Sequence, residues 1–92
     1  MTLARFAKRR DSNEAEVVAA LEAAGAVVCR LDRPVDLLVG CNGLWTVLEV
    51  KRPKGGLRDG QEAFLRLAAS RGLPAYVVFS AEDALRAVGA TH

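Results

Sequence analysis

The sequence has few of the residues that zinc sites and disulfide frameworks use. It holds two cysteines, Cys29 and Cys41, and its one histidine is the last residue, His92. Because the cysteines lack the short, regular spacing of metal ligands, we expect no zinc site and two reduced thiols. No apolar stretch is long enough to span a membrane, and no signal-peptide pattern opens the chain. These absences together predict a cytoplasmic protein.

The chain also has little net charge. It carries 13 Lys and Arg residues against 11 Asp and Glu residues, which gives a formal net charge of +2. DNA binding would therefore have to use local basic patches rather than the field of the whole molecule. Two clusters qualify, and for each the alternative is an ordinary solvated run of surface charge. They are Arg5, Lys8, Arg9 and Arg10, and then Lys51, Arg52, Lys54 and Arg58.

Length and hydrophobic patterning predict one small domain over 1–92 that opens with a basic arm over 1–10. The loop Pro53-Lys54-Gly55-Gly56 lacks the Gly-Lys-Ser/Thr ending of a P-loop, so we expect no nucleotide site there. The expected order is α-β-β-β-α-β-α, with helices over 11–24, 59–71 and 81–88 and strands over 27–31, 35–39, 45–51 and 75–79. Both faces of the central strands are largely apolar, so we expect helices on both faces of the sheet.

A hairpin around Asn42-Gly43 is the most informative feature of the chain. Asn-Gly between two apolar, β-branched runs predicts a two-residue type I′ turn. Counting back from that turn along both strands places Asp36 directly opposite Glu49, with Lys51 on the same face. Like charges about 5 Å apart on paired strands are destabilising, so the two carboxylates need a cation or a proton between them. Two carboxylates and a lysine on one patch predict divalent-metal binding and phosphodiester hydrolysis.

Two polar residues begin otherwise apolar helix faces. Glu14 lies on the stripe that continues to Leu21, and Gln61 lies on the stripe that continues to Ala68. The alternative for Glu14 is a capping box with Asp11, which has the right spacing. The alternative for Gln61 is an ordinary hydrogen bond to a loop carbonyl. We favour a role in the site for both residues because of the opposed carboxylates on the hairpin.

These residues in this order resemble the PD-(D/E)XK nuclease superfamily, and within it the small stand-alone VRR-NUC-type proteins of bacteria and phages. The resemblance covers roughly residues 11–80 and comprises Asn13-Glu14, Asp36, Glu49-Val50-Lys51 and Gln61-Glu62-Ala63-Phe64. Glu-x-Lys alone occurs by chance in many proteins, but its place on a hairpin opposite an aspartate makes the set specific. One departure is that Val35 separates Pro34 from Asp36, whereas the family usually has the proline adjacent to the aspartate.

The resemblance implies a restriction-endonuclease-like α/β fold, with an αβββαβ core, a mixed sheet and helices on both faces. It also implies a divalent-metal-dependent phosphodiesterase that acts on DNA, and in some relatives structure-selective cleavage of branched DNA by a dimer. We expect Asp36 and Glu49, helped by Glu14 and the Val50 carbonyl, to hold Mg²⁺ or Mn²⁺ through oxygen ligands. Lys51 would position or deprotonate the attacking water, or neutralise charge on phosphorus.

The remaining expectations concern DNA and assembly. Gln61 would orient Lys51 or contact the DNA backbone, and DNA contacts are expected from Arg9, Arg10, Arg52, Lys54 and Arg58. One copy offers a small basic face, so we expect a homodimer or a higher even-numbered oligomer that joins through Tyr76–Val88 or an exposed edge strand.

Two alternatives to a nuclease remain. One is a catalytically silent nucleic-acid-binding or scaffold domain of the same fold, against which the intact Asp36, Glu49 and Lys51 argue. The other is a purely structural interaction domain, which requires Glu49 and Lys51 to form a surface ion pair and Asp36 to be a turn residue.

Overall fold

Three helices and four strands alternate along the chain in the expected order. The computed structural model describes residues 13–52, 56–57 and 59–90. The elements are α1 (Glu14–Ala23), β1 (Val27–Arg30), β2 (Leu37–Cys41), β3 (Leu44–Val50), α2 (Asp59–Ser70), β4 (Ala75–Val78) and α3 (Ala81–Ala87). Most boundaries lie within one or two residues of the expected ones, as helix and strand ends usually do. No helix in this part of the chain is long and apolar enough to cross a membrane.

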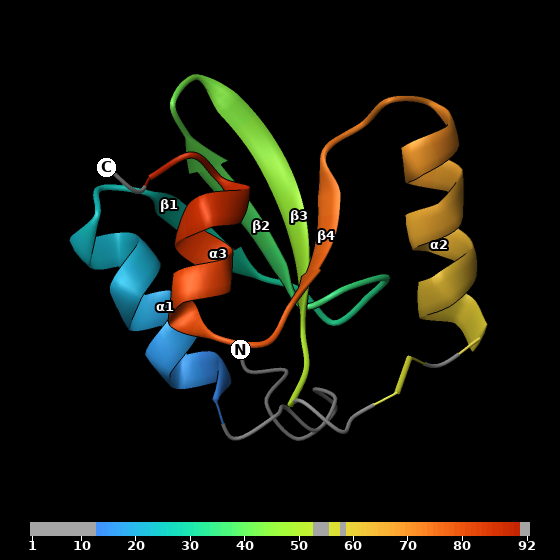
Figure 1. The fold of residues 1–92 in the computed structure, drawn as a ribbon, viewed down its shortest axis with the longest axis horizontal. Coiled ribbons are helices and arrows are strands. Elements are labelled where there is room, and N and C mark those ends of the chain that lie inside the picture. The colour runs from blue at the N-terminus through green and yellow to red at the C-terminus, as the bar shows by residue number, and fades with distance from the viewer. Residues whose placement is uncertain (1–12, 53–55, 58, 91–92) are drawn as a thin grey trace, which may run out of the picture.

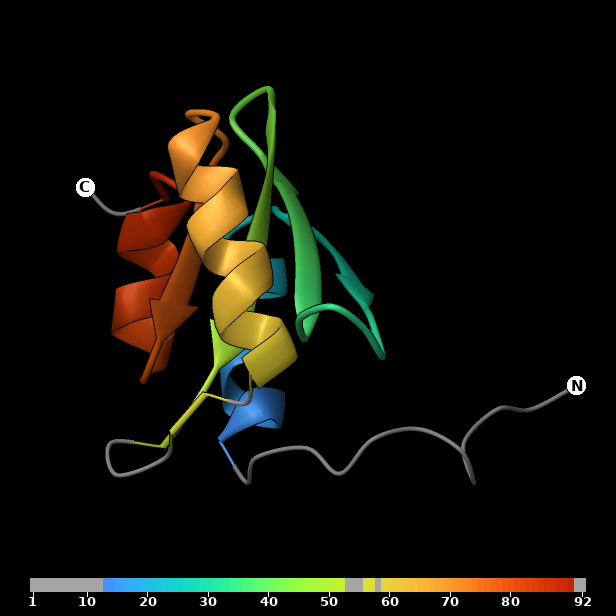
Figure 2. The same cartoon turned by 90° about the vertical axis from the view of Figure 1, so that its right-hand side faces the viewer.

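The four strands form one mixed sheet in the order β1-β2-β3-β4. Strand β2 is antiparallel to both β1 and β3, and β4 runs parallel to β3. A parallel neighbour needs a crossover connection, and α2 supplies it. Helices α1 and α3 lie together on one side of the sheet and α2 lies on the other, beside β4 (Figure 1, Figure 2). The expected α/β architecture with helices on both faces is therefore confirmed.

The Asn42-Gly43 turn has the geometry that the sequence predicts. Both residues have positive φ, 55° for Asn42 and 78° for Gly43, as a type I′ turn requires. The expected register is confirmed from Cys41↔Leu44 back to Leu37↔Leu48. The side-chain amide of Asn42 also donates to the carbonyls of Val88 and Gly89, at 3.2 and 2.8 Å, and so fastens the turn to the end of α3.

The expected strand over 35–39 was wrong in its bounds, since β2 runs over Leu37–Cys41. Asp36 therefore lies directly before the strand rather than within it. The cause is a side-chain bond: the Asp36 carboxylate accepts from the Val50 N–H at 2.8 Å, which takes the place of the next rung of the ladder. On its other side the Asp36 carbonyl accepts from Leu31 N–H at 2.7 Å.

Helix ends follow local sequence signals. Gly25 adopts a φ of 93°, and the Ala26 N–H reaches back to the Leu21 carbonyl at 3.0 Å, which closes α1 with a Schellman motif. At the start of α3, the Ser80 hydroxyl accepts from the Asp83 N–H at 3.0 Å, as the expected cap requires. These signals are local in the chain, and so they could be identified before the fold was known.

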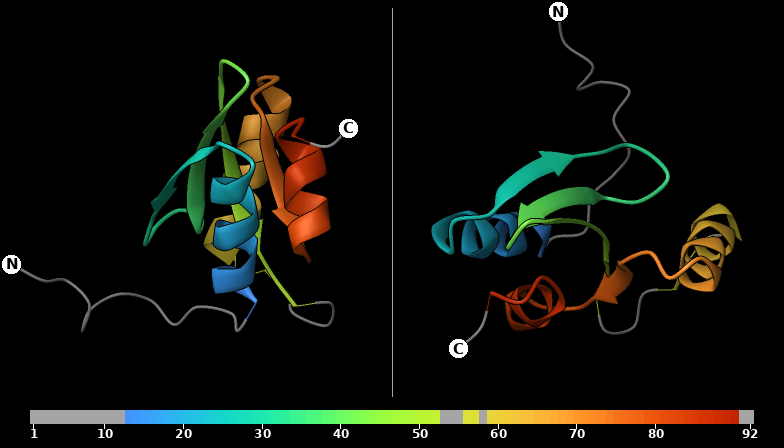
Figure 3. Two further views of the ribbon diagram at one scale, coloured as in Figure 1. Left: turned by 90° about the vertical axis from the view of Figure 1, so that its left-hand side faces the viewer. Right: turned by 90° about the horizontal axis from the view of Figure 1, so that it is seen from above.

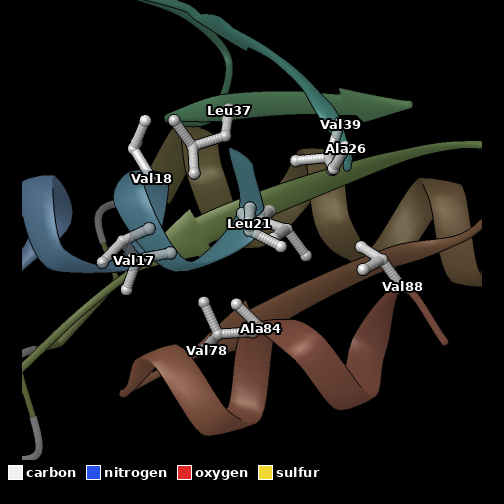
Figure 4. Close-up of a cluster of buried hydrophobic side chains, with 11 residues drawn as sticks. Val17, Val18, Leu21, Ala26, Leu37, Val39, Val78, Ala84 and Val88 are labelled. Atoms are coloured by element: carbon white, nitrogen blue, oxygen red, sulfur yellow. The ribbon is translucent and has the colours of Figure 1, made fainter. Parts of the chain in front are cut away.

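The hydrophobic core lies between the sheet and the pair α1 and α3 (Figure 4). Its members are Val17, Val18, Leu21, Ala26, Leu37, Val39, Leu48, Val50, Val78, Ala84 and Val88. Because side chains alternate along a strand, Leu48 and Val50 of β3 point into this core, and Trp45, Val47 and Glu49 point to the opposite face. Helix α2 covers that opposite face beside β4, whereas β1 and β2 lie farther from it (Figure 3).

Candidate active site

Glu49 lies at the centre of a buried polar cluster on the α2 side of the sheet. Its residue surface is 1% exposed. One carboxylate oxygen, Oε2, accepts a hydrogen bond of 2.6 Å from the Gln61 side-chain amide and lies 3.3 Å from the Lys51 ammonium nitrogen. The side chain of Lys51 is itself largely buried. A carboxylate in an apolar sheet is thus held between a cation and an amide donor, as buried charges require.

Asp36 lies against the peptide that follows Glu49, just beyond the end of the hairpin ladder. The last paired residues of the ladder are Leu37 and Leu48, and Asp36 and Glu49 are the next residues outward on the two strands. Asp36 is 4% exposed, and its Oδ2 accepts from the Val50 N–H, which belongs to the peptide that follows Glu49. The fold therefore brings two buried carboxylates to the same end of the β2–β3 ladder.

Gln61 reaches the cluster from α2. The residue is buried, at 7% exposure, on the same helix face as Ala68, which agrees with the expected polar start of an apolar stripe. Its contact is with the Glu49 carboxylate. The sequence marked Gln61 as part of the site but did not identify Glu49 as its partner, because that pairing depends on how α2 packs against β3.

Both backbone polar groups of Lys51, its N–H and its carbonyl, form hydrogen bonds. Its N–H donates to the Val78 carbonyl at 2.9 Å. Its carbonyl accepts from the Asn13 side-chain amide at 3.3 Å, and the same amide donates to the Phe79 carbonyl at 3.1 Å. Asn13 therefore ties the start of α1 to the ends of β3 and β4, a positioning role that the sequence did not reveal.

Glu14 is buried at 2% exposure, as its place on the core-facing stripe predicts. It is the first residue of α1, so it does not occupy the third helical position of a capping box. Its Oε2 lies 3.7 Å from Nε of Arg30, which extends from β1. Arg30 was not among the expected site residues, although strand alternation places it on the same face as Val28, toward α1.

The set of residues expected to hold metal is therefore grouped in two parts. Asp36, Glu49 and the Val50 peptide lie together, whereas Glu14 contacts Arg30. Within the residues that the structure describes, no three His, Cys, Asp or Glu side chains form a group that could hold a metal ion. Glu14 as a third carboxylate ligand stays a prediction.

The basic residues expected to contact DNA are described in part. Arg52 follows Lys51 directly and is exposed. Arg9, Arg10, Lys54 and Arg58 lie outside the described residues. The two cysteines, Cys29 and Cys41, are free thiols.

Comparisons with known proteins identify the fold. No protein-family model and no curated protein matches the sequence. A solved structure described as "VRR_NUC domain" matches with a TM-score of 0.68 at 22% sequence identity, over 89% of this chain and 100% of that chain. The chain has the VRR-NUC fold. VRR-NUC domains belong to the PD-(D/E)XK superfamily, so the resemblance drawn from the sequence is confirmed at the level of the fold.

Proposed function

We propose that this protein is a divalent-metal-dependent DNA nuclease that hydrolyses phosphodiester bonds. The observation that carries the proposal is the burial of both Asp36 and Glu49. The Glu49 carboxylate pairs with the Lys51 ammonium and accepts a hydrogen bond from the Gln61 amide. The VRR-NUC fold, in which nuclease-type domains are built, supports it. Fold by itself does not decide function, so the argument rests on the chemistry of the cluster.

The cost of the cluster argues against a purely structural role. Two buried carboxylates repel one another, and each pays several kcal/mol to leave water. The contacts that hold them are polar: the Lys51 ammonium lies 3.3 Å from Glu49, and the Val50 N–H donates to Asp36. An apolar pair at positions 36 and 49 would pack between the same strands without that cost. Buried charges that local rules do not explain are typical of functional sites.

The donor set fits Mg²⁺ or Mn²⁺. Both are hard cations that prefer oxygen, and Mg²⁺ in particular uses one or two carboxylates and keeps several waters. Asp36 and Glu49 would be the carboxylate ligands, and the Val50 carbonyl and Glu14 are further oxygen donors expected from the resemblance. A divalent ion bound there would supply polarisation of the phosphate and a lowered pKa of bound water.

The protein groups around the carboxylates have distinct tasks. The Lys51 ammonium, held by Glu49 and by the anchored backbone of its strand end, would stabilise negative charge that develops on the phosphate. It would also position the attacking water. Gln61 would fix the rotamer of Glu49 through the 2.6 Å hydrogen bond, so that one oxygen keeps its orientation.

DNA would approach along the basic residues that follow β3. Arg52 is exposed directly beside Lys51, and Arg9, Arg10, Lys54 and Arg58 are expected to add phosphate contacts. Affinity for DNA rises with the number of phosphates neutralised, so one copy of this small basic surface should bind weakly at physiological salt. We also propose that the enzyme cleaves branched DNA selectively.

We also propose a homodimer, because two copies would double the basic surface and present two sites. The β4 edge and α3 are the expected interface, and the exposed rings of Tyr76 and Phe79 lie there. Light scattering at micromolar concentration, with and without DNA, tests this. A monomer under both conditions would refute it.

The test of the proposed function is cleavage of single-stranded, duplex, flap and four-way-junction DNA with Mg²⁺, with Mn²⁺ and with EDTA. Wild type should cut at least one substrate when metal is present. Glu49→Gln should be inactive, whereas Glu62→Gln, a change at an exposed glutamate of α2, should be fully active. DNA binding without metal-dependent cutting of any substrate would instead favour the silent scaffold domain.

A further inference from the structure

An exposed tryptophan lies on the same strand face as the candidate active site. Along β3, the side chains of Trp45, Val47 and Glu49 alternate onto the face opposite the α1–α3 core, and Lys51 continues that row. Trp45 and Glu49 are four residues apart, which is about 13 Å along a strand. That span equals about four nucleotides at the duplex rise of about 3.4 Å per base, and fewer in an extended strand.

The indole of Trp45 lies flat against the sheet. Its cross-strand partner is Gly40, and a Cβ on Gly40 would come within 2.9, 3.1 and 3.2 Å of three consecutive ring carbons of Trp45. Near-equal distances to three consecutive carbons mean that Gly40 lies under the face of the ring and not beyond its edge. A glycine at position 40 is what allows this close approach.

More than half of the Trp45 surface is open to solvent. Trp45 is 56% exposed, and α2 packs beside β4 rather than over this part of the sheet (Figure 3). A tryptophan that served the core would bury most of its large apolar surface. Here one ring face is supported by backbone, and much of the ring stays exposed on the face of the sheet that also carries Glu49.

We propose that Trp45 is a stacking platform for an unpaired base of the DNA strand whose phosphate lies at the Asp36–Glu49–Lys51 cluster. This inference rests on the proposed nuclease function and adds a subsite to it. Base–aromatic stacking contributes about 1–3 kcal/mol per base and accepts any base, because each has a π-face. A base inside a duplex already has neighbours on both faces, so the platform selects nucleotides that are free of their stack.

The sole tryptophan of the chain gives a direct readout, since its fluorescence reports on Trp45 alone. Wild-type protein in EDTA at low salt is titrated with a short oligothymidylate. A second titration uses an abasic strand of the same length, which carries the same phosphates without bases. We expect quenching by the first strand and little change with the second. Equal responses to both strands, or none to either, would overturn the proposal.

Affinity measurements on variants complete the test. Fluorescence anisotropy of a labelled single strand should show a loss of about 5- to 150-fold for Trp45→Ala, the range equivalent to one stacked base. Trp45→Phe should retain part of the affinity. Leu67→Ala removes an equally exposed apolar side chain from α2 and should bind as wild type does. An affinity unchanged in Trp45→Ala would contradict the platform.

The platform and the nuclease activity can fail separately. If base-dependent quenching occurs but no metal-dependent cleavage is found, the platform stands and the nuclease proposal fails. If wild type and Trp45→Ala cleave flap and single-stranded DNA equally, the platform fails and the nuclease stands. If Trp45→Ala converts a dimer to a monomer in light scattering, the ring is an interface between copies and the stacking role is refuted.

Discussion

Without metal, Glu49→Gln should be at least as stable as wild type. With saturating metal, it should be less stable than wild type. The substitution keeps the shape of the side chain and an oxygen that can accept the hydrogen bond from Gln61, which is 2.6 Å long in the wild-type structure. It removes the charge that attracts Lys51, the charge that repels Asp36, and one of the two proposed carboxylate ligands. The change in the free energy of unfolding is therefore a balance among these contributions.

The balance can be worked from the geometry. At the 3.3 Å separation of Glu49 and Lys51, an effective dielectric constant near 20 gives an attraction of about 5 kcal/mol. Two carboxylate charges at a separation of about 5 Å, the spacing of opposed side chains on paired strands, would repel by about 3 kcal/mol on the same basis. The surplus of about 2 kcal/mol is smaller than the several kcal/mol that desolvation of Glu49 costs. Metal-free Glu49→Gln should thus unfold at the same temperature as wild type or higher.

Metal should reverse this order. A ligand at one hundred times its dissociation constant adds about 2.7 kcal/mol to the protein that binds it. In a domain of this size each kcal/mol corresponds to roughly 4–8 °C in Tm. Wild type should therefore gain about 10–20 °C at saturating Mn²⁺, and Glu49→Gln should gain far less.

Thermal unfolding followed by circular dichroism, with EDTA and with a Mn²⁺ series, measures both effects. Glu62→Gln is the matched control, because its exposed pair with Arg66 should be worth less than about 1 kcal/mol. A metal-free Glu49→Gln protein destabilised by more than about 3 kcal/mol would show that the Glu49–Lys51 pair is a structural element. A metal-induced rise that survives the substitution would remove Glu49 from the metal site.

Three further changes test other parts of the structure. Lys51→Ala should keep the metal-induced rise in Tm but cleave DNA about 10²- to 10³-fold more slowly, and equal loss of both would make Lys51 a structural partner of Glu49. Asn42→Asp replaces the donor to the carbonyls of Val88 and Gly89 with a carboxylate, so urea unfolding should show a loss of about 1–3 kcal/mol; an unchanged midpoint would contradict that anchoring role. Leu48→Ala in the buried core should cost about 2–5 kcal/mol in the same assay, and a cost below 1 kcal/mol would mean that the α1–α3 side is loosely packed.

Local signals decided much of what could be predicted. The Asn42-Gly43 turn fixed the hairpin register, because its two positive φ values suit few other residue pairs. Once the register was set, strand alternation predicted Asp36 opposite Glu49 with Lys51 on the same face, and the structure buries both carboxylates. The helix stripes likewise predicted that Glu14 and Gln61 would be buried. Each of these inferences depends only on the turn, on alternation along a strand, or on spacing along one helix.

Other features depend on how separate elements pack, and a linear pattern does not contain that information. The start of β2 at Leu37 follows from the Asp36 side chain, which takes the Val50 N–H in place of a backbone carbonyl. The Arg30 contact of Glu14 requires α1 to lie across β1. The limited cover by α2, which leaves Trp45 exposed over Gly40, depends on the crossover between β3 and β4.

The sequence by itself determined the order of elements, the hairpin and the acidic pair, because turn geometry and side-chain alternation act between residues that are close along the chain. The tertiary structure alone decided which groups meet that pair. Gln61 reaches Glu49 from α2, and Asn13 fixes the carbonyl of Lys51 from the start of α1. Such contacts join residues distant in sequence, and they form only when packing of the apolar faces sets the position of each helix on the sheet.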